Sequence, residues 1–298
     1  MPILLHRPSN RRDFLKTTTL GGAALILAAG RSAAATDAGA SEFHLALLSD
    51  THIPADRTEV YRDFNPCDNL DRVVPQVIAA RPEGVVLCGD AARLEGKLED
   101  YRQLRAQIEP LAAAAPVFIG LGNHDDRASF RKVFTSPAGT LAAIDGKHVT
   151  VIEHPGVRVV VLDSLLYPNR VAGLLGKAQR AWLTSSLPTL ADRPLVFFVH
   201  HTLGEGDGDL LDADRLFTIV RPHRHVKAIF YGHSHVWELG ERDRLQLINL
   251  PSLGYNFRDQ DPIGWVDARF RSDGVSLTLR AVGGNRTDDG KTFDVRWI

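Results

Sequence analysis

The feature that most constrains the fold of this chain is a short apolar run, repeated along the sequence, that ends abruptly in Asp, Asn or His. The clearest example spans residues 116–125, where Pro-Val-Phe-Ile-Gly-Leu-Gly leads directly into Asn-His-Asp. Such a run predicts a strand buried on both faces, followed by a functional loop at its carboxyl end. Similar runs begin near residues 43, 84, 194 and 226. Helical spacing separates most of them, which predicts an α/β fold with layered sheets.

The ends of these five predicted strands carry side chains of the types that bind metal ions. They are Asp50 and His52, Asp90, Asn123 and His124, His200 and His201, and His233 and His235. Any one of these ends is compatible with an ordinary turn or a structural histidine. In an α/β protein, however, ligands bind beyond the carboxyl ends of the strands. Five such ends at one edge therefore indicate metal binding.

The residue types favour two ions. Carboxylates and imidazoles with one amide suit Zn, Mn, Fe or Co, whereas Ca and Mg prefer more oxygen ligands. Seven candidate ligands are too many for one tetrahedral ion, and one shared carboxylate would give four ligands to each of two. Two ions roughly 3.5–4 Å apart form the clamp used in phosphoester displacement. We therefore expect two divalent or trivalent transition-metal ions whose identity the sequence leaves open.

Helices are expected between the strands. Apolar spacing predicts a first helix capped by Asp68 or Asn69 and a second over residues 97–115, which Pro110 should kink or end. Two more are predicted over residues 176–187 and 212–220. The tail from residue 245 alternates apolar and polar residues, which predicts antiparallel strands.

The five motifs, in this order, resemble those of the calcineurin-like metallophosphoesterases over residues from about 43 to about 235. The resemblance implies a four-layer αββα sandwich of two mixed β-sheets flanked by helices, with a dinuclear metal site at the strand carboxyl ends. It also implies how the ligands divide: Asp50, His52 and His235 on one ion, Asn123, His200 and His233 on the other, and Asp90 bridging both.

The same resemblance assigns catalytic roles. His124 would face the substrate as a proton donor or charge stabiliser, with Asp125 orienting it. The family pattern favours His200 over His201 as the ligand, and neighbouring strand residues face opposite ways. His201 would then face the substrate, and Asn123 would also contact it.

The implied reaction is hydrolysis of a small-molecule phosphodiester by a hydroxide that bridges the ions. Residues 162–164 and 173–183 resemble the branch acting on cyclic nucleotides or glycerophosphodiesters. Residues 91–93 lack the Tyr ligand of purple acid phosphatases. A phosphomonoesterase of the same fold and a non-catalytic exported metal- or ligand-binding protein are the alternatives. Candidates for contacting the substrate's phosphate or headgroup are Arg93, Arg170 and Arg258.

The first 35 residues have the layout of a signal peptide. Basic residues precede a short apolar segment, residues 20–30, and three alanines follow at 33–35. Residues 10–16, Asn-Arg-Arg-Asp-Phe-Leu-Lys, resemble the twin-arginine export motif. We expect a signal peptide over 1–35, one metallophosphoesterase domain over 36–298, and a periplasmic or secreted protein that uses the export machinery. No stable membrane insertion is expected after cleavage, because the apolar segment is too short to span a bilayer.

Net charge and cysteine content bear on two further questions, nucleic-acid binding and disulfide formation. The chain has 298 residues and a formal net charge of −1, which gives no indication of nucleic-acid binding. An oxidising compartment would permit a bridge between Cys67 and Cys88. Cys88 lies in the apolar run 84–88, however, as an inert core residue would. We therefore favour two free thiols.

Overall fold

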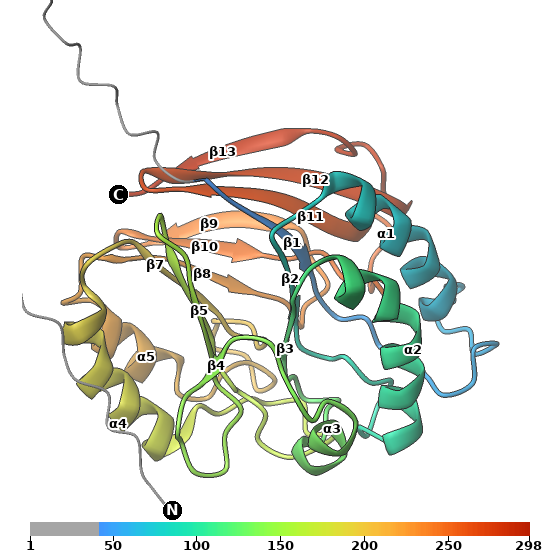
Figure 1. Ribbon diagram of the computed structural model, residues 1–298, viewed down its shortest axis with the longest axis horizontal. Coiled ribbons are helices and arrows are strands. Elements are labelled where there is room, and N and C mark those ends of the chain that lie inside the picture. The colour runs from blue at the N-terminus through green and yellow to red at the C-terminus, as the bar shows by residue number, and fades with distance from the viewer. Residues whose placement is uncertain (1–41) are drawn as a thin grey trace, which may run out of the picture. The chain divides into compact units, whose positions relative to one another are not determined.

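Two mixed β-sheets pack face to face in the computed structural model, which describes residues 42–298 (Figure 1). The first sheet has six strands, in the order β13 (Thr292–Arg296), β12 (Gly274–Gly284), β11 (Pro262–Arg271), β1 (Phe43–Leu48), β2 (Gly84–Cys88) and β3 (Val117–Gly120). The second has seven, in the order β4 (Thr140–Leu141), β5 (Thr150–Glu153), β6 (Arg158–Val161), β7 (Leu195–Phe198), β8 (Val226–Tyr231), β10 (Leu245–Asn249) and β9 (Glu238–Arg242).

Helices cover the outer face of each sheet. The first sheet carries α1 (Pro66–Ala80), α2 (Leu98–Ala114) and α3 (Arg127–Val133). The second carries α4 (Gly176–Ser186), the 3-10 turn η1 (Leu187–Leu190) and α5 (Ala213–Val220). The predicted αββα sandwich is thereby confirmed, with two helical layers enclosing two sheets (Figure 1).

The core explains why the strands read as continuous apolar runs. Leu47 and Phe198 face each other's sheet in the layer between the two sheets, and both are fully buried. Alternate residues of the same strands, such as Leu48 and Phe197, pack under the helices on the outer side. Both faces of each central strand are therefore apolar, as strands covered on both sides require.

The register brings the strand ends to one place. β1, β2 and β3 run parallel, with Leu47 opposite Val86 and Leu87 opposite Ile119. β6, β7 and β8 are also parallel neighbours in the second sheet. The carboxyl ends of each parallel set lie at one edge, where the loops that follow can meet.

Three local details differ from what the sequence predicts. Asn65, not Asp68 or Asn69, caps α1, accepting a hydrogen bond from the Asp68 N–H at 3.1 Å. Pro110 does not end α2, which continues to Ala114, and a kink at this proline stays a prediction. Its side of the helix is exposed, so water can satisfy the carbonyl that proline leaves unpaired. In the tail, β11 to β13 are antiparallel as predicted, but β10 pairs with β8 in parallel.

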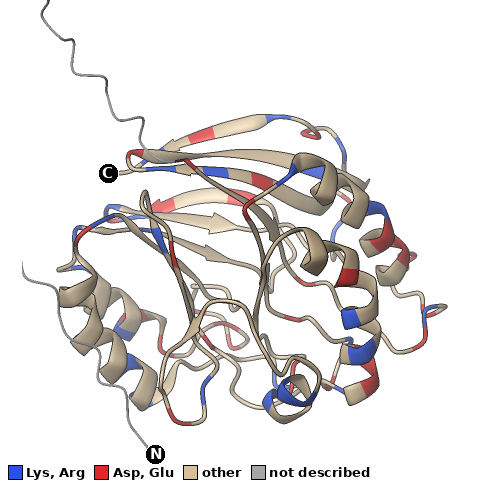
Figure 2. Cartoon of the chain, viewed as in Figure 1, with Lys and Arg blue, Asp and Glu red and all other residues tan. Residues whose placement is uncertain are grey.

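Charged side chains of both signs are interspersed on the helices and loops, while most central strands carry none (Figure 2). Cys67 and Cys88 are buried free thiols in different core layers, one on the buried face of α1 and one between the sheets. Within residues 42–298, no helix has the length and hydropathy needed to cross a bilayer. The predicted signal peptide lies outside the described residues.

Candidate dinuclear metal centre

The loops after five strands bring the predicted ligands together. Three overlapping groups form, and the potential ligand atoms within each group lie within 4.8 Å of one another. The groups are Asp50, His52 and His235; His52, Asp90 and His124; and Asp90, His200 and His233. The first group holds the three residues predicted for one ion, and the third holds Asp90 with two of the residues predicted for the other. Asp90 and His52 each occur in two groups, and Asp90 is the carboxylate of the two.

The backbone at these positions is held in an uncommon conformation. In the described part of the chain ten non-glycine residues have positive φ, and five of them are candidate ligands. These five are Asp50, His52, Asp90, His233 and His235, with φ from 47° to 69°. A residue with a Cβ pays for positive φ in free energy, and such strain clusters at functional sites. The strand-to-loop turns therefore adopt an unfavourable backbone conformation that directs the candidate ligand side chains toward one another.

The candidate histidine ligands are oriented by backbone carbonyls. His200 Nδ1 donates to the Cys88 carbonyl at 2.9 Å, and His235 Nδ1 donates to the Tyr255 carbonyl at 2.6 Å. His52 Nδ1 donates to the carbonyl of Arg93 at 3.2 Å. In each case the bond places a proton on Nδ1, the outer nitrogen, so Nε2 is the nitrogen that faces the centre and can bind a metal ion.

His233 is oriented through Nε2 instead of Nδ1. Its Nε2 donates to the Gly208 carbonyl at 3.0 Å, so Nδ1 is the nitrogen left free to bind. The inner nitrogens of His52 and His235 face each other at 3.2 Å. Two unprotonated imidazole nitrogens at this distance repel each other unless a cation lies beside them, so the donor set fits metal ions.

Both carboxylates contact residues of the two proposed subsites. Asp90 Oδ2 lies 3.2 Å from His200 Nε2 and 3.7 Å from His52 Nε2. Asp50 Oδ1 lies 3.3 Å from His235 Nε2 and 3.9 Å from His200 Nε2. Asn123 completes the cluster, with Oδ1 3.3 Å from His200 Nε2. His200, and not its neighbour His201, therefore lies among the ligands.

The two buried carboxylates of this cluster carry negative charge that bound cations would neutralise. Among residues 42–298, Asp50 and Asp90 form ion pairs with histidines alone. Burial lowers the pKa of His200, but the nearby Asp90 and Asp50 outweigh it and raise this pKa to about 9. Burial lowers the pKa of His52 to about 3. A proton on His200 thus balances the carboxylates, and metal ions would take over that role and release the proton.

His124 lies beside the ligands, but its predicted partner is wrong. The His124 ring is 5.2 Å from that of His52, and the backbone N–H of His124 donates to Asp90 Oδ1 at 2.8 Å. Its Nδ1 donates to the Leu94 carbonyl at 2.8 Å, not to Asp125. The carbonyl therefore orients the ring and leaves Nε2 for exchange with a substrate.

Asp125 instead holds two strand-end loops together. Its carboxylate accepts hydrogen bonds from the backbone N–H groups of Ala91, Ala92 and Gly122 and from the Tyr101 hydroxyl, at 2.8–3.2 Å. Burial and the charge of Asp90 raise the pKa of Asp125 to about 6. Its role is to position the loops that carry Asp90 and the ligands after β3.

His201 is fully buried behind the ligands. Its Nδ1 is 2.7 Å from Ser164 Oγ, and its ring is 4.7 Å from that of His233. This arrangement does not support the predicted contact with a substrate. It supports a packing role behind His233. Asn123 is likewise buried, at 1% exposure, and its amide oxygen faces His200.

The three predicted arginines have different surroundings. Arg93 lies near the centre, where its guanidinium pairs with Glu59 and covers the Tyr61 ring at 4.7 Å. Arg258 pairs with Asp261 at 2.7 Å, and Arg170 is exposed. Of the three, only Arg93 is part of the wall beside the ligands.

The sequence reasoning missed the aromatic residues around the centre. The Tyr255 ring lies 4.7 Å from His52 and 4.8 Å from His235, and the Phe257 ring stacks on His235 at 4.4 Å. Their segment follows β10 and has no metal-ligand pattern. Its only signal is a pair of aromatic residues in a polar loop.

Two sheets flanked by helices, with seven metal-ligand side chains at the strand ends, define a metallophosphoesterase fold. The sequence profile named Calcineurin-like phosphoesterase matches residues 43–237. The chain belongs to this family.

Curated relatives include several phosphodiesterases. A protein of Rhodococcus erythropolis described as a probable cyclic nucleotide phosphodiesterase is 33% identical over 198 residues, which are 63% of each chain. A cAMP/cGMP dual specificity phosphodiesterase of Mycobacterium tuberculosis is 32% identical over 65% of this chain and 62% of its own length. A glycerophosphodiester phosphodiesterase of Enterobacter lignolyticus is 29% identical over 70% and 76%. The chain thus spans a little over three fifths of the first two relatives.

Solved structures agree on the fold. A dimetal phosphatase from Danio rerio superimposes with a TM-score of 0.68 at 16% identity, over 86% of this chain and 99% of that one. The structure of PhoD superimposes with a TM-score of 0.58 at 12% identity, over 85% and 68%. Identities this low support the architecture alone.

Proposed function

We propose that this protein is a metal-dependent phosphodiesterase that hydrolyses a small-molecule phosphodiester. The observation that carries the proposal is the convergence of two carboxylates, one amide and four imidazoles, with His124 beside them. Pure metal storage would not require an oriented histidine at the open side of the cluster. The names of the three relatives favour a diester over a monoester.

The residues divide the work. Two bound transition-metal ions would supply an activated water and neutralise charge on the phosphoryl oxygens. Asp90 fixes the backbone of His124 through the 2.8 Å hydrogen bond to its N–H. The Leu94 carbonyl holds the His124 ring, so a proton on Nε2 can pass to the departing oxygen. General acid catalysis of this kind typically contributes about 10²–10⁴-fold.

The decisive experiment pairs metal analysis with two model substrates. The purified protein, loaded in turn with Mn, Zn, Fe and Co, is assayed on bis(p-nitrophenyl) phosphate and on p-nitrophenyl phosphate. We expect two ions per chain and faster hydrolysis of the diester. Preference for the monoester would favour a phosphomonoesterase, and metal binding without hydrolysis of either would favour a binding protein.

Two variants sharpen that experiment. Asp90→Asn should lose more metal and activity than any other single ligand change, because Asp90 contacts residues of both subsites. Asp273→Asn removes a carboxylate that is 76% exposed and should leave both quantities unchanged. Equal metal content in Asp90→Asn and wild type would contradict the proposal that Asp90 bridges the two ions.

We also propose that the protein is exported through the twin-arginine route. The support is the order of basic, apolar and small residues in 1–35. Mass spectrometry of the protein produced in a bacterial host should find a mature chain that begins near residue 36 in the periplasm or medium. Replacing Arg11 and Arg12 with Lys should trap the precursor in the cytoplasm. An N-terminus at Met1 in the exported fraction would contradict the proposal.

A further inference from the structure

A two-residue hairpin turn lies in the loop between β1 and α1, close to the metal centre. Tyr61 and Phe64 exchange two backbone hydrogen bonds, at 2.8 and 3.0 Å. The central residues, Arg62 and Asp63, have φ of 52° and 66°. Turns with positive φ at both central positions favour Asn-Gly, because a side chain is costly there. Arg-Asp in these positions is a strained choice, and retained strain of this kind points to a functional constraint.

The turn presents Arg62 to aromatic rings. Its guanidinium lies 5.1 Å from the ring centre of Phe257 and 5.8 Å from that of Tyr61. Within residues 42–298 no carboxylate forms an ion pair with Arg62. Phe257 is 45% exposed, and its ring stacks on the candidate ligand His235 at an interplanar angle of 25°. The His235 ring, the Phe257 ring and the Arg62 guanidinium therefore form one series of planar groups from the candidate metal ligand to the protein surface.

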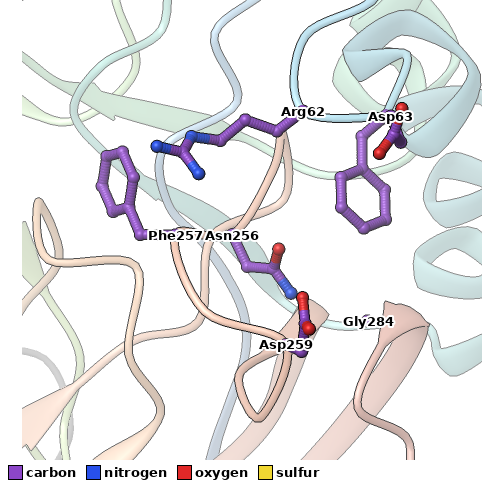
Figure 3. Close-up of a pocket in the computed structure, with 7 residues that line it drawn as sticks. Arg62, Asp63, Asn256, Phe257, Asp259 and Gly284 are labelled. Atoms are coloured by element: carbon purple, nitrogen blue, oxygen red, sulfur yellow. The ribbon is translucent and has the colours of Figure 1, made fainter.

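Next to this series is a cavity of about 420 Å³. It is lined by Arg62, Asp63, Phe64, Asn256, Phe257, Asp259 and Gly284. Figure 3 shows Arg62 reaching toward Phe257, with the side chains of Asn256 and Asp259 on the other side of the space. Asn256 Nδ2 donates to the Asp261 carbonyl at 2.8 Å, which leaves its Oδ1 as an acceptor.

The composition of this lining selects among ligands. It contains two phenylalanine rings and one planar guanidinium but no aliphatic side chain. Such surfaces stack on planar groups, and carboxylate and amide oxygens at the edge accept hydrogen bonds from amino groups. The lining holds one guanidinium and two carboxylates, those of Asp63 and Asp259. Arg62 already lies over the Phe257 ring, which is the aromatic face that a quaternary ammonium headgroup would need. A small alkyl group would leave the rings uncovered.

We propose that this cavity is a subsite for a planar heteroaromatic group, of the nucleobase kind, carried by the phosphodiester that the metal centre cleaves. The inference rests on the proposed function, because the phosphate must lie at the metal centre for the group to reach the cavity. Arg62 and Phe257 are then specificity-determining residues. They contact the substrate away from the bond that breaks.

The test compares two ligands that differ only in the base. Calorimetry on the metal-loaded full chain measures the affinity for AMP and for ribose 5-phosphate, which share the sugar and the phosphate. We expect AMP to bind about 10- to 100-fold more tightly, the range typical of stacking one base on protein side chains. Equal affinities for the two ligands would overturn the proposal.

Variants locate the effect. Arg62→Ala keeps a Cβ at the strained position, and Phe257→Leu keeps an apolar side chain, so each removes a flat surface with little change to the backbone. Each should reduce the ratio of the two affinities at least fivefold while the affinity for ribose 5-phosphate stays constant. Arg102→Ala is the control, because this exposed arginine pairs with Glu99 on α2, away from the cavity. A ratio preserved in both variants would contradict the assignment.

Hydrolysis of bis(p-nitrophenyl) phosphate, measured on the same samples, separates the two proposals. A protein that prefers AMP but hydrolyses no phosphoester retains the subsite and loses the proposed function. A protein that hydrolyses the diester but binds both ligands equally retains the function and loses the subsite. Metal content must match wild type in Phe257→Leu, because Phe257 stacks on His235.

Discussion

Replacing Gly122 with alanine should dismantle the metal centre while leaving most of the fold intact. Gly122 lies between β3 and Asn123, with no room for a side chain. A Cβ at this position would lie 2.6 Å from both the Asp90 backbone nitrogen and His200 Cδ2, and closer still to Asp90 Oδ1. Non-bonded heavy atoms prefer about 3.5–4.0 Å, so Asp90 and His200 must both move by about 1 Å.

That displacement sets the size of the effect. Ligand distances in metal sites tolerate only about 0.2 Å, so each proposed ion would lose at least one ligand. Losing merely an outer partner of a ligand costs about 10–100-fold in metal affinity, and we therefore expect a loss of at least about 100-fold here. Overpacking should also lower the free energy of unfolding by about 1–3 kcal/mol.

The assay needs two measurements and one control. Urea unfolding in the presence of chelator isolates the packing cost, and metal competition measures affinity. Gly240→Ala is the control, because the nearest atom to its Cβ is the Leu247 carbonyl oxygen at 4.0 Å. It should leave metal affinity unchanged. Full metal content and normal turnover in Gly122→Ala would refute the geometric reasoning.

Three further predictions concern the catalytic group, the core and pH. His124→Gln should keep both ions but lower kcat about 10²–10⁴-fold, and normal turnover would exclude the residue from the chemistry. Phe198→Ala should lower the free energy of unfolding by about 3–5 kcal/mol in urea titrations, because this fully buried ring stacks on Phe230 between the sheets; a loss below about 1 kcal/mol would contradict this. Burial raises the pKa of Asp267, but the hydrogen bond from His44 outweighs it, so the pKa lies below its ordinary value. Asp267 therefore stabilises the fold above about pH 4, the pKa of an unperturbed aspartate, and this contribution falls as the pH drops below that value. The Tm difference between wild type and Asp267→Asn should be present at pH 6 and decrease progressively on acidification below about pH 4. A difference independent of pH would argue against the linkage.

The strands and their ends could be predicted because burial and chemistry act on local sequence. The run 84–88 coincides with β2, since a strand covered on both faces must be apolar throughout. The run 226–231 coincides with β8, in which Lys227 is the one charged residue. The alternating tail predicted strands but not their directions. Periodicity describes one strand's faces and says nothing about its neighbour, so the parallel pairing of β10 with β8 could not be foreseen.

The errors at the site have a similar cause. The family resemblance implied that Asp125 orients His124, but the Asp125 carboxylate accepts hydrogen bonds from three backbone N–H groups and the Tyr101 hydroxyl instead. Backbone donors leave no trace in a sequence. The same holds for the Leu94 carbonyl that orients His124. Tyr61 and Phe257 are brought to the same arginine only by the fold, so no local pattern could connect them.

The ligands come from both sheets, and this has a consequence for assembly. Asp50 and Asp90 follow β1 and β2, whereas His200 and His235 follow β7 and β8. Bound ions would therefore act as a clasp across the sandwich, and they could be held only once both halves have closed. An ion present at 100 times its dissociation constant would add about 2.7 kcal/mol to the closed state. A chain that binds its ions late would therefore have a lower Tm until they are bound.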